Sequence, residues 1–374
     1  MKQNELFPKI RFKEFTNAWE QEKLGELVFY KTSSIILSNL NNNGKYCVYD
    51  ANGIAGKIDI EPVSEEYISI IKDGAGAGRV RLLPKNTHIL STMGAILPLN
   101  TTDIKFVYFL LSKNSHLMKE ASGSTIPHIY FKNYSQNIYI VPCNKEQYKI
   151  SSLFSNLDSL ITLHQRKYLA LKNLKNTLLE KMFCDEKSKF PHIRFKEFTN
   201  AWEQWKVKDI FEITRGYVVS KKEILETKSG EYIYPIYSSQ TINDGLLGYY
   251  KSYLASNAIT WTTDGANAGT VSYRKGRFYA TNVCGLLSTK AFTPNLYLAF
   301  ALSSETYKHV AKVGNPKLMN NTMANIELII TSNLVEQSKI SSLFSNLDSL
   351  ITLHQRKLEL LKNTKNTLLD KMFV

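Results

Sequence analysis

Apolar side chains recur with a seven-residue period over two long stretches of the chain, residues 151–183 and 341–373. Neither stretch contains Pro or Gly, and Leu, Lys and Asn are frequent in both. Apolar residues at the first and fourth positions of successive heptads are typical of a helix that pairs in a coiled coil. The positions predicted to form the pairing surface are Phe154, Leu157, Ile161, Leu171 and Leu178 in the first stretch and Phe344, Leu347, Ile351, Leu361 and Leu368 in the second.

Two polar residues interrupt this pattern in each stretch. Lys175 and Lys365 take one apolar position, and His164 and His354 take another. Polar residues there fix the register of a coiled coil at some cost in stability, so we interpret both histidines as pairing residues and not as catalytic ones. A helix over 151–183 is about 50 Å long and cannot bury its apolar stripe alone. We therefore expect the two helices to pack together, antiparallel if a twofold axis relates the halves of the chain.

The chain also repeats itself outside these stretches. KISSLFSNLDSLITLHQRK occurs at 149–167 and at 339–357, and IRFKEFTNAWEQ occurs at 10–21 and at 193–204. Each half is thus a short leading segment, a long middle and a closing helix. The predicted boundaries are 1–21, 22–148 and 149–189 for the first half and 190–204, 205–338 and 339–374 for the second.

The two middles share landmarks but little identity. IKDGAGAGRV at 71–80 lies against TTDGANAGTV at 262–271. Short apolar runs alternate with Gly, Asn and Asp turns, which predicts strands, and a helix is expected within 103–121 and within 296–312. A nucleotide-binding glycine loop would open a helix, whereas strands are expected after both motifs, so we interpret each as a tight turn within a sheet. The predicted fold class is α+β: two mixed α/β domains related by a pseudo-twofold axis and joined by two long helices in an antiparallel coiled coil.

Charge and composition narrow the choice of partner. The chain has 47 Lys and Arg against 33 Asp and Glu, a formal net charge of +14. This excess favours a polyanion such as nucleic acid, although a generic basic protein would share it. The sequence has no apolar run long enough for a membrane span and no secretory signal at its start, so we expect a cytoplasmic protein. The four cysteines form no CxxC pair, which predicts free thiols and no metal site. No catalytic motif repeats, and we expect no catalytic residue and no cofactor.

Polar loops of the two middles are the candidate DNA contacts. Asn, Ser, Gln, Thr, Tyr and Lys side chains can hydrogen-bond to base edges and phosphates, although they suit solvated turns equally well. A glycine turn also lets a backbone come close to a phosphate. The candidate residues are Tyr49, Asn52, Gly74, Gly76, Arg79, Thr125, His128, Tyr130 and Lys132 in the first middle and Ser238, Ser239, Gln240, Gly265, Asn267, Lys317, Asn320 and Asn321 in the second.

With its duplicated helix, its duplicated leading segment and its divergent middles, the chain resembles the specificity subunits of type I restriction–modification systems over essentially its whole length. The resemblance implies a non-catalytic DNA-binding subunit with two target-recognition domains, each reading half of a bipartite, asymmetric target in double-stranded DNA. It also implies helices that set the spacing of these domains and dock two copies of a modification (methyltransferase) subunit. Restriction (translocase and nuclease) subunits would join the full complex, so methyl transfer and cleavage would occur in other chains, and no membrane would be involved.

Two alternatives stay open on the residues alone. A coiled-coil adaptor for protein interactions would explain the repeat but gives no reason for the basic charge. A solitary DNA-modifying enzyme would need a catalytic motif that the sequence does not show. DNA binding that weakens with salt would exclude the adaptor, which does not bind DNA. An activity assay of the purified chain with S-adenosylmethionine and Mg²⁺ would distinguish the enzyme from a non-catalytic subunit.

Overall fold

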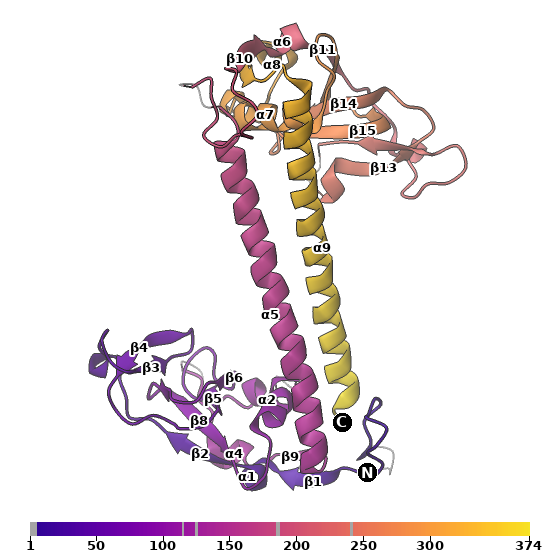
Figure 1. Cartoon of the computed structure of the whole chain (residues 1–374). Coiled ribbons are helices and arrows are strands. Elements are labelled where there is room, and N and C mark those ends of the chain that lie inside the picture. The colour runs from indigo at the N-terminus through magenta and orange to yellow at the C-terminus, as the bar shows by residue number, and fades with distance from the viewer. Residues whose placement is uncertain (1–5, 114–115, 124–125, 185–187, 240–241) are drawn as a thin grey trace. The chain divides into compact units, whose positions relative to one another are not determined.

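The computed structural model describes residues 6–113, 116–123, 126–184, 188–239 and 242–374 (Figure 1). The chain divides into two compact units. The first unit comprises Met1–Arg166 and Gln355–Val374, and the second comprises Lys167–His354. Each of the two long helices therefore contributes one part to each unit.

The first unit combines short, mostly antiparallel strands with short helices. Strands β2, β8, β5 and β6 form one sheet in that order, β4, β3 and β7 form a second, and β1 pairs with β9. The strands are β1 (Glu20–Lys23), β2 (Val28–Thr32), β3 (Tyr46–Tyr49), β4 (Ile54–Ile58), β5 (Tyr67–Ile71), β6 (Val80–Leu83), β7 (His88–Ile89), β8 (Met93–Pro98) and β9 (Ile138–Val141). The helices that precede the long one are α1 (Leu24–Leu27), α2 (Ile104–Lys113), α3 (His116–Lys119) and α4 (Phe131–Tyr134).

The second unit repeats this order of elements. Its main sheet has the strand order β11, β16, β14, β15, β12 and β13, and β10 pairs with β17. The strands are β10 (Glu203–Lys206), β11 (Phe211–Arg215), β12 (Tyr234–Tyr237), β13 (Leu246–Tyr250), β14 (Ala255–Thr262), β15 (Val271–Ala280), β16 (Cys284–Thr289) and β17 (Glu327–Ile330). The short helices are α6 (Val207–Ile210), α7 (Leu296–Thr306) and α8 (Asn320–Ala324).

A proline accounts for the division of the sheet in the first unit. When the glycine motifs are aligned, residues 80–89 correspond to residues 271–280. The second segment is the continuous strand β15, which pairs with both β14 and β12. In the first segment Pro84 stands between β6 and β7, and proline has no N–H for a strand ladder. The two halves of the sheet are therefore separate there.

The two long helices, α5 (Asn144–Lys181) and α9 (Leu334–Met372), run antiparallel within each unit. In the first unit Phe154, near the start of α5, packs against Phe373, which follows the end of α9, with ring centroids 5.8 Å apart. In the second unit Phe344, near the start of α9, packs in the same way against Phe183 at 6.2 Å. The predicted pairing residues Phe154, Phe344 and Leu347 are buried, and Leu157, Ile161, Leu171, Leu178, Ile351, Leu361 and Leu368 are half-buried.

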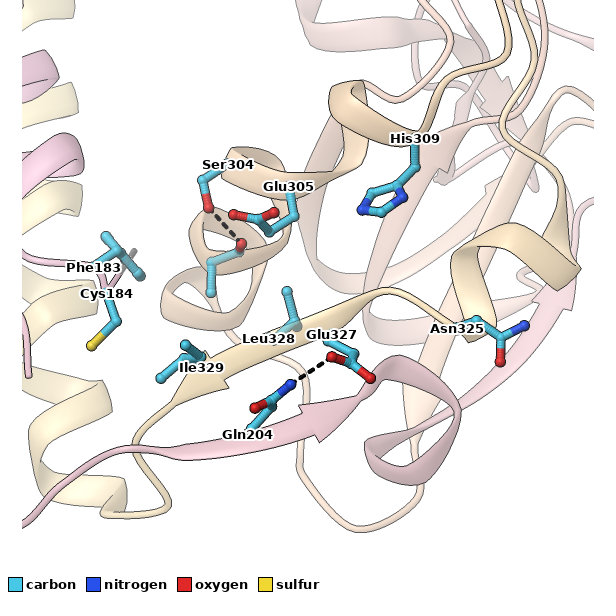
Figure 2. Close-up of a pocket in the computed structure, with 11 residues that line it drawn as sticks. Phe183, Cys184, Gln204, Ser304, Glu305, His309, Asn325, Glu327, Leu328 and Ile329 are labelled. Carbon is cyan, nitrogen blue, oxygen red and sulfur yellow. Dashed lines mark hydrogen bonds between the residues drawn. The ribbon is translucent and has the colours of Figure 1, made fainter. Parts of the chain in front are cut away.

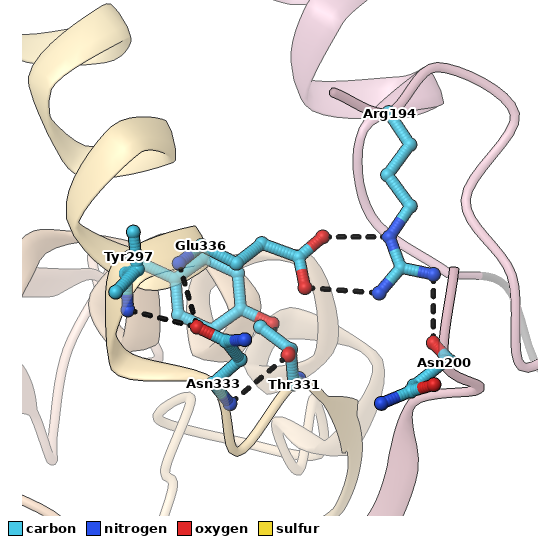
Figure 3. Close-up of polar contacts among 7 residues, drawn as sticks. Arg194, Asn200, Tyr297, Thr331, Asn333 and Glu336 are labelled. Atoms are coloured by element: carbon cyan, nitrogen blue, oxygen red, sulfur yellow. Dashed lines mark hydrogen bonds and ion pairs between the residues drawn. The ribbon is translucent and has the colours of Figure 1, made fainter. Parts of the chain in front are cut away.

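A buried ion pair holds each leading segment to a long helix. The Arg11 guanidinium donates two hydrogen bonds of 2.7 Å to the Glu146 carboxylate of α5. Arg194 does the same to Glu336 of α9 at 2.7 and 2.9 Å (Figure 3). Both glutamate side chains have no exposed surface, and the hydrogen bond to Glu336 raises the pKa of Arg194. The leading segments therefore belong to the core of their units, where Trp19 and Trp202 are also buried.

Whether a helix could span a membrane depends on its length and on how apolar its residues are. α5 and α9 have 38 and 39 residues, but exposed charged residues are spread along both. In the described part of the chain, no helix has a stretch apolar enough to cross a lipid bilayer.

Candidate nucleic-acid interface

Three segments that are far apart in the sequence meet in each unit. We call residues 49–53, 73–79 and 126–132 the first face, and residues 237–239, 242–245, 264–270 and 315–321 the second face. In both faces the first segment begins at the last residue of a strand, the second is the glycine turn of a hairpin, and the third ends in the first turn of a short helix. The glycine turns connect β5 to β6 and β14 to β15, as expected for tight turns within a sheet.

Main-chain hydrogen bonds join the glycine turn of the first face to its third segment. The Gly74 N–H donates to the Pro127 carbonyl at 2.9 Å, and the Ile129 N–H donates to the Lys72 carbonyl at 2.9 Å. The His128 ring nitrogen Nδ1 lies 2.7 Å from Oδ1 of Asp73. These contacts leave Tyr130 58% exposed beside the turn, where an aromatic ring can contact a base or sugar.

An arginine joins the same turn to the first segment. The Arg79 guanidinium donates to the Ala51 carbonyl at 2.7 Å, and Arg81 of β6 donates to the same oxygen at 3.1 Å. Arg79 is nevertheless exposed, so part of its guanidinium is accessible to a ligand. The three segments of the first face are thus held together by direct hydrogen bonds.

The second face has the same main-chain frame. The Gly265 N–H donates to the Pro316 carbonyl at 2.9 Å, and the Leu318 N–H donates to the Thr263 carbonyl at 2.8 Å. Here Asn267 of the turn joins the first segment, because its amide donates to the Ser239 carbonyl at 3.1 Å. Burial raises the pKa of Tyr237, so its hydroxyl remains protonated at neutral pH.

Side chains at matching positions of the two faces differ. With the glycine motifs aligned, Gly76 and Arg79 stand where the second unit has Asn267 and Thr270. With Pro127 and Pro316 aligned, His128, Tyr130 and Lys132 stand where the second unit has Lys317, Met319 and Asn321. The same main-chain arrangement therefore carries two different sets of side chains.

The glycines give the frame an open edge. Gly74 and Gly265 have φ angles of +102° and +94°, a region that glycine adopts readily and other residues rarely do. No atom lies within 4 Å of the place where a Cβ would stand at either position. The backbone at both turns is therefore accessible to a close-fitting ligand such as a phosphate.

The remaining predicted contacts take different places. Asn52 and Lys132 are exposed in the first face, whereas Tyr49 is half-buried and packs against the apolar cluster beneath it. In the second face Lys317 and Asn321 are exposed, and Ser238, Ser239 and Asn320 are half-buried. Thr125 and Gln240 lie outside the described residues.

Several charged residues of the faces were not predicted from the sequence. Arg215 donates to Asp264 at 2.9 Å at the start of the second glycine turn, and Arg274 donates to Asp244 at 2.6 Å. The two arginines lie on strands β11 and β15, outside any polar loop. A sequence signal existed only for Asp73 and Asp264, which stand at the same position of the repeated glycine motif.

A pocket of about 420 Å³ lies in the second unit away from this face (Figure 2). It is lined by Phe183 and Cys184, by residues of α7 and by the β10–β17 pair, where the Gln204 amide donates to Glu327 at 2.5 Å. In the first unit Lys113 takes the position that Glu305 has in the second unit. The Lys113 ammonium group donates to the Phe373 carbonyl at 3.1 Å. None of the predicted DNA contacts lines the pocket.

The fold and the arrangement of the three segments occur twice, which defines a protein built from two related halves. The chain belongs to the type I restriction modification DNA specificity domain family, whose model matches residues 17–173 and 199–363. Specificity subunits are the non-catalytic components of type I systems. The matched residues cover both middles and most of both long helices.

Individual relatives agree with this assignment. A Mycoplasma pneumoniae protein named as the N-terminus of a type I specificity subunit is 46% identical over 144 residues, which are 37% of this chain and 74% of that protein. The specificity subunit of the type I restriction enzyme MpnII from the same organism is 42% identical over 130 residues, 34% of this chain. The match spans only 38% of the length of that second relative.

A solved structure shares the fold over nearly the whole chain. The crystal structure of the type I restriction–modification S subunit from M. genitalium matches with a TM-score of 0.74. The match covers 98% of this chain and 99% of that one at 19% sequence identity. The α+β class and the paired long helices predicted from the sequence are thereby confirmed.

Proposed function

We propose that each unit of this specificity subunit reads one half of a bipartite, asymmetric target in double-stranded DNA. The observation that carries the proposal is that both units bring the same three segments together while the side chains at matching positions differ. A shared frame with unlike polar groups suits two unlike half-sites, because base edges are distinguished by their donor and acceptor patterns. Methyl transfer and cleavage then belong to modification and restriction subunits of the same cytoplasmic complex.

DNA binding is expected to depend steeply on salt. The formal net charge of +14 favours phosphate contacts, and each contact releases counterions from the duplex. Six or more such contacts would lower the affinity about 10³-fold or more between 50 and 200 mM salt. A coiled-coil adaptor that does not bind DNA would give no shift at either salt concentration.

The long helices are proposed to set the gap between the two blocks of the target. Removing one heptad from each helix, residues 160–166 and 350–356, deletes the same sequence LITLHQR twice and keeps the apolar period. Each helix becomes about 10 Å shorter, which equals the rise of about three base pairs. We expect the same two blocks with a gap about three base pairs shorter. Altered blocks with an unchanged gap would contradict the spacer role.

Two copies of a modification subunit are proposed to bind the surfaces that the two halves share. Leu160 and Leu163 are 43% and 45% exposed, and their copies Leu350 and Leu353 have the same values. Large apolar side chains at the surface of identical segments suit one kind of partner bound twice. Restriction subunits would then join this assembly to complete the complex.

Methylome sequencing tests the proposal as a whole. Cells that carry the chain together with its neighbouring methyltransferase should methylate a target of two short blocks around a fixed gap. Deleting the chain should abolish this methylation. Methyl transfer by the purified chain alone would instead support the solitary enzyme, and an unchanged methylome after deletion would support the adaptor.

A further inference from the structure

The segments that follow β3 and β12 are closed by the same main-chain bond but differ in length and in side-chain contacts. In the first face the Asp50 N–H donates to the Gly53 carbonyl at 2.8 Å, and the Asp50 carboxylate accepts hydrogen bonds of 2.7 Å from the N–H groups of Asn52 and Gly53. In the second face the Ser238 N–H donates to the Gly245 carbonyl at 2.9 Å, and more residues of the sequence lie between these two ends. Longer loops lose more entropy when their ends are fixed, so side-chain contacts at the ends help to hold this loop.

Arg274 of β15 supplies such contacts at both ends of the second loop. Its Nη1 donates to Oδ2 of Asp244 at 2.6 Å, and its guanidinium carbon lies 3.9 Å from the centroid of the Tyr237 ring. Its Nε donates to Oγ1 of Thr260 at 3.2 Å, which fixes the guanidinium on the sheet. Asp244 has a φ of +54°, which a non-glycine residue adopts at a cost in free energy, and the ion pair helps to hold it there.

The fold itself does not require an arginine at this position. The aligned residue of the first unit is Leu83, which is 2% exposed in an apolar cluster with Tyr67 and Ile71. Arg274 is also buried, at 6% exposure, and removing a charge from water is costly. Its partner Asp244 is 78% exposed, so solvent screens the ion pair and limits its contribution to stability. Stability alone therefore gives little reason for this arginine.

We propose that Arg274 is a positioning residue for DNA recognition by the second unit, which fixes Tyr237 and Asp244 so that Ser238 and Ser239 face one part of the target. The inference rests on the proposed function. With 6% of its surface exposed, Arg274 acts through the loop and not by touching a base. The preference for bases in the second block of the target should then depend on a residue that makes no DNA contact.

The test selects bound sequences from a randomised DNA library with the full chain in its complex with modification subunits. Three variants are compared with the parent: Asp244→Asn, Arg274→Lys and Arg274→Leu, the last of which introduces the residue of the first unit. Glu305→Gln is the matched control, because it removes the carboxylate that pairs with Lys308 at 2.9 Å in the same unit but on α7. Thermal unfolding of each variant is measured alongside.

Asp244→Asn and Arg274→Leu are expected to reduce base discrimination in the second block about tenfold, the discrimination that one base position typically supplies. The first block should keep its preference, Arg274→Lys should recover part of the loss, and Glu305→Gln should change neither block.

Equal weakening of both blocks, or a lower unfolding temperature with intact discrimination, would show a purely structural role and overturn the inference. If Arg274→Leu does not fold, the Asp244→Asn variant tests the inference instead, because this substitution changes an exposed side chain. A parent that selects no bipartite sequence would refute the proposed function itself, and the inference would fall with it.

Discussion

Lys175 and Lys365 stand at heptad positions that usually hold apolar residues, and the structure gives each lysine a specific partner. In the first unit Lys365 Nζ of α9 lies 2.5 Å from Oδ1 of Asp158 on α5. In the second unit Lys175 Nζ of α5 lies 2.6 Å from Oδ1 of Asp348 on α9. Both lysine side chains are about four-fifths buried, so each pair can fix the register of the helices more effectively than a surface pair would.

Reversing one charge of this pair should destabilise the first unit. Asp158→Lys places two ammonium groups together, and we expect the free energy of unfolding to fall by about 1 kcal/mol, because Asp158 is 40% exposed and the pair is partly screened. Adding Lys365→Asp should restore most of the loss. Urea unfolding of the parent, of the Asp158→Lys and Lys365→Asp single variants and of the double variant measures this difference. A double variant no more stable than the sum of its single changes would contradict a direct interaction.

The long helices begin differently although their later sequence is copied. Asn333 precedes α9, and its side-chain oxygen accepts hydrogen bonds from the N–H groups of Val335 at 2.9 Å and Glu336 at 3.2 Å. Cys143 precedes α5 at the same position and contributes only its main-chain carbonyl, which accepts from Glu146 and Gln147. Asparagine is among the best residues for the start of a helix and cysteine is not. The first helix thus lacks a cap that the second has.

Cys143→Asn is therefore expected to stabilise the start of α5. The new side chain can accept from N–H groups of the first turn as Asn333 does in α9, and we expect a gain of about 1 kcal/mol in the free energy of unfolding. Asn333→Cys should cost a similar amount in the second unit. Hydrogen exchange at the first turn of each helix measures both effects. Opposite shifts at the two helices support the explanation, and no shift at either would contradict it.

The copied surface of the helices offers a second test at this scale. If Leu160 and Leu163 bind a modification subunit, replacing both by Ser should reduce the number of these subunits per chain from two to one. Leu169→Ser is the matched control, because Leu169 is 50% exposed on the same helix but its counterpart is Glu359. Native mass spectrometry of the reconstituted complex counts the subunits. Two bound copies in the Leu160 and Leu163 variant would contradict docking at this surface.

The sequence predicted the long helices better than their beginnings. A seven-residue period and the absence of Pro and Gly define a paired helix, but α5 and α9 start at Asn144 and Leu334, five residues before the copied segments. These first turns lie outside the copied segments, and they are stabilised by the buried Glu146 and Glu336 and, in α9 alone, by the Asn333 side-chain cap. Periodicity cannot reveal contributions of that kind.

The candidate face was predictable as a set of loops but not as an arrangement. The glycine motif and the polar loops could be identified from composition, whereas the hydrogen bond between Gly74 and Pro127 joins residues that are 53 positions apart. Arg274 gave no signal, because an isolated arginine within a strand is usually a solvated residue. Only the fold shows that it is buried beside Tyr237.

At the scale of the whole molecule, the first unit is assembled from both ends of the chain. The leading segment docks on the last turn of α9, where the Ile10 N–H donates to the Lys371 carbonyl at 2.9 Å. In the second unit the copied segment docks on the last turn of α5, where the Ile193 N–H donates to the Lys181 carbonyl at 2.8 Å. The connection from a long helix to a leading segment is thus continuous in the second unit, whereas in the first unit the helix and the segment come from opposite ends of the sequence.

This equivalence predicts that the chain tolerates circular permutation. Residues 184–188 connect Phe183 to Lys189, and joining Val374 to Met1 would connect Phe373 to the equivalent Leu6 through six residues, 374 and 1–5. Opening a five-residue connection and closing a six-residue one changes the loop-closure free energy by only about 0.2 kcal/mol. A chain joined in this way and opened after Cys184 should therefore have a free energy of unfolding within about 1 kcal/mol of that of the parent. It should also select the same two DNA blocks. A control permutant with the same join, opened after Ser159 within α5, interrupts a helix and should be markedly less stable. Equal destabilisation of both permutants in urea would show that the two junctions are not equivalent.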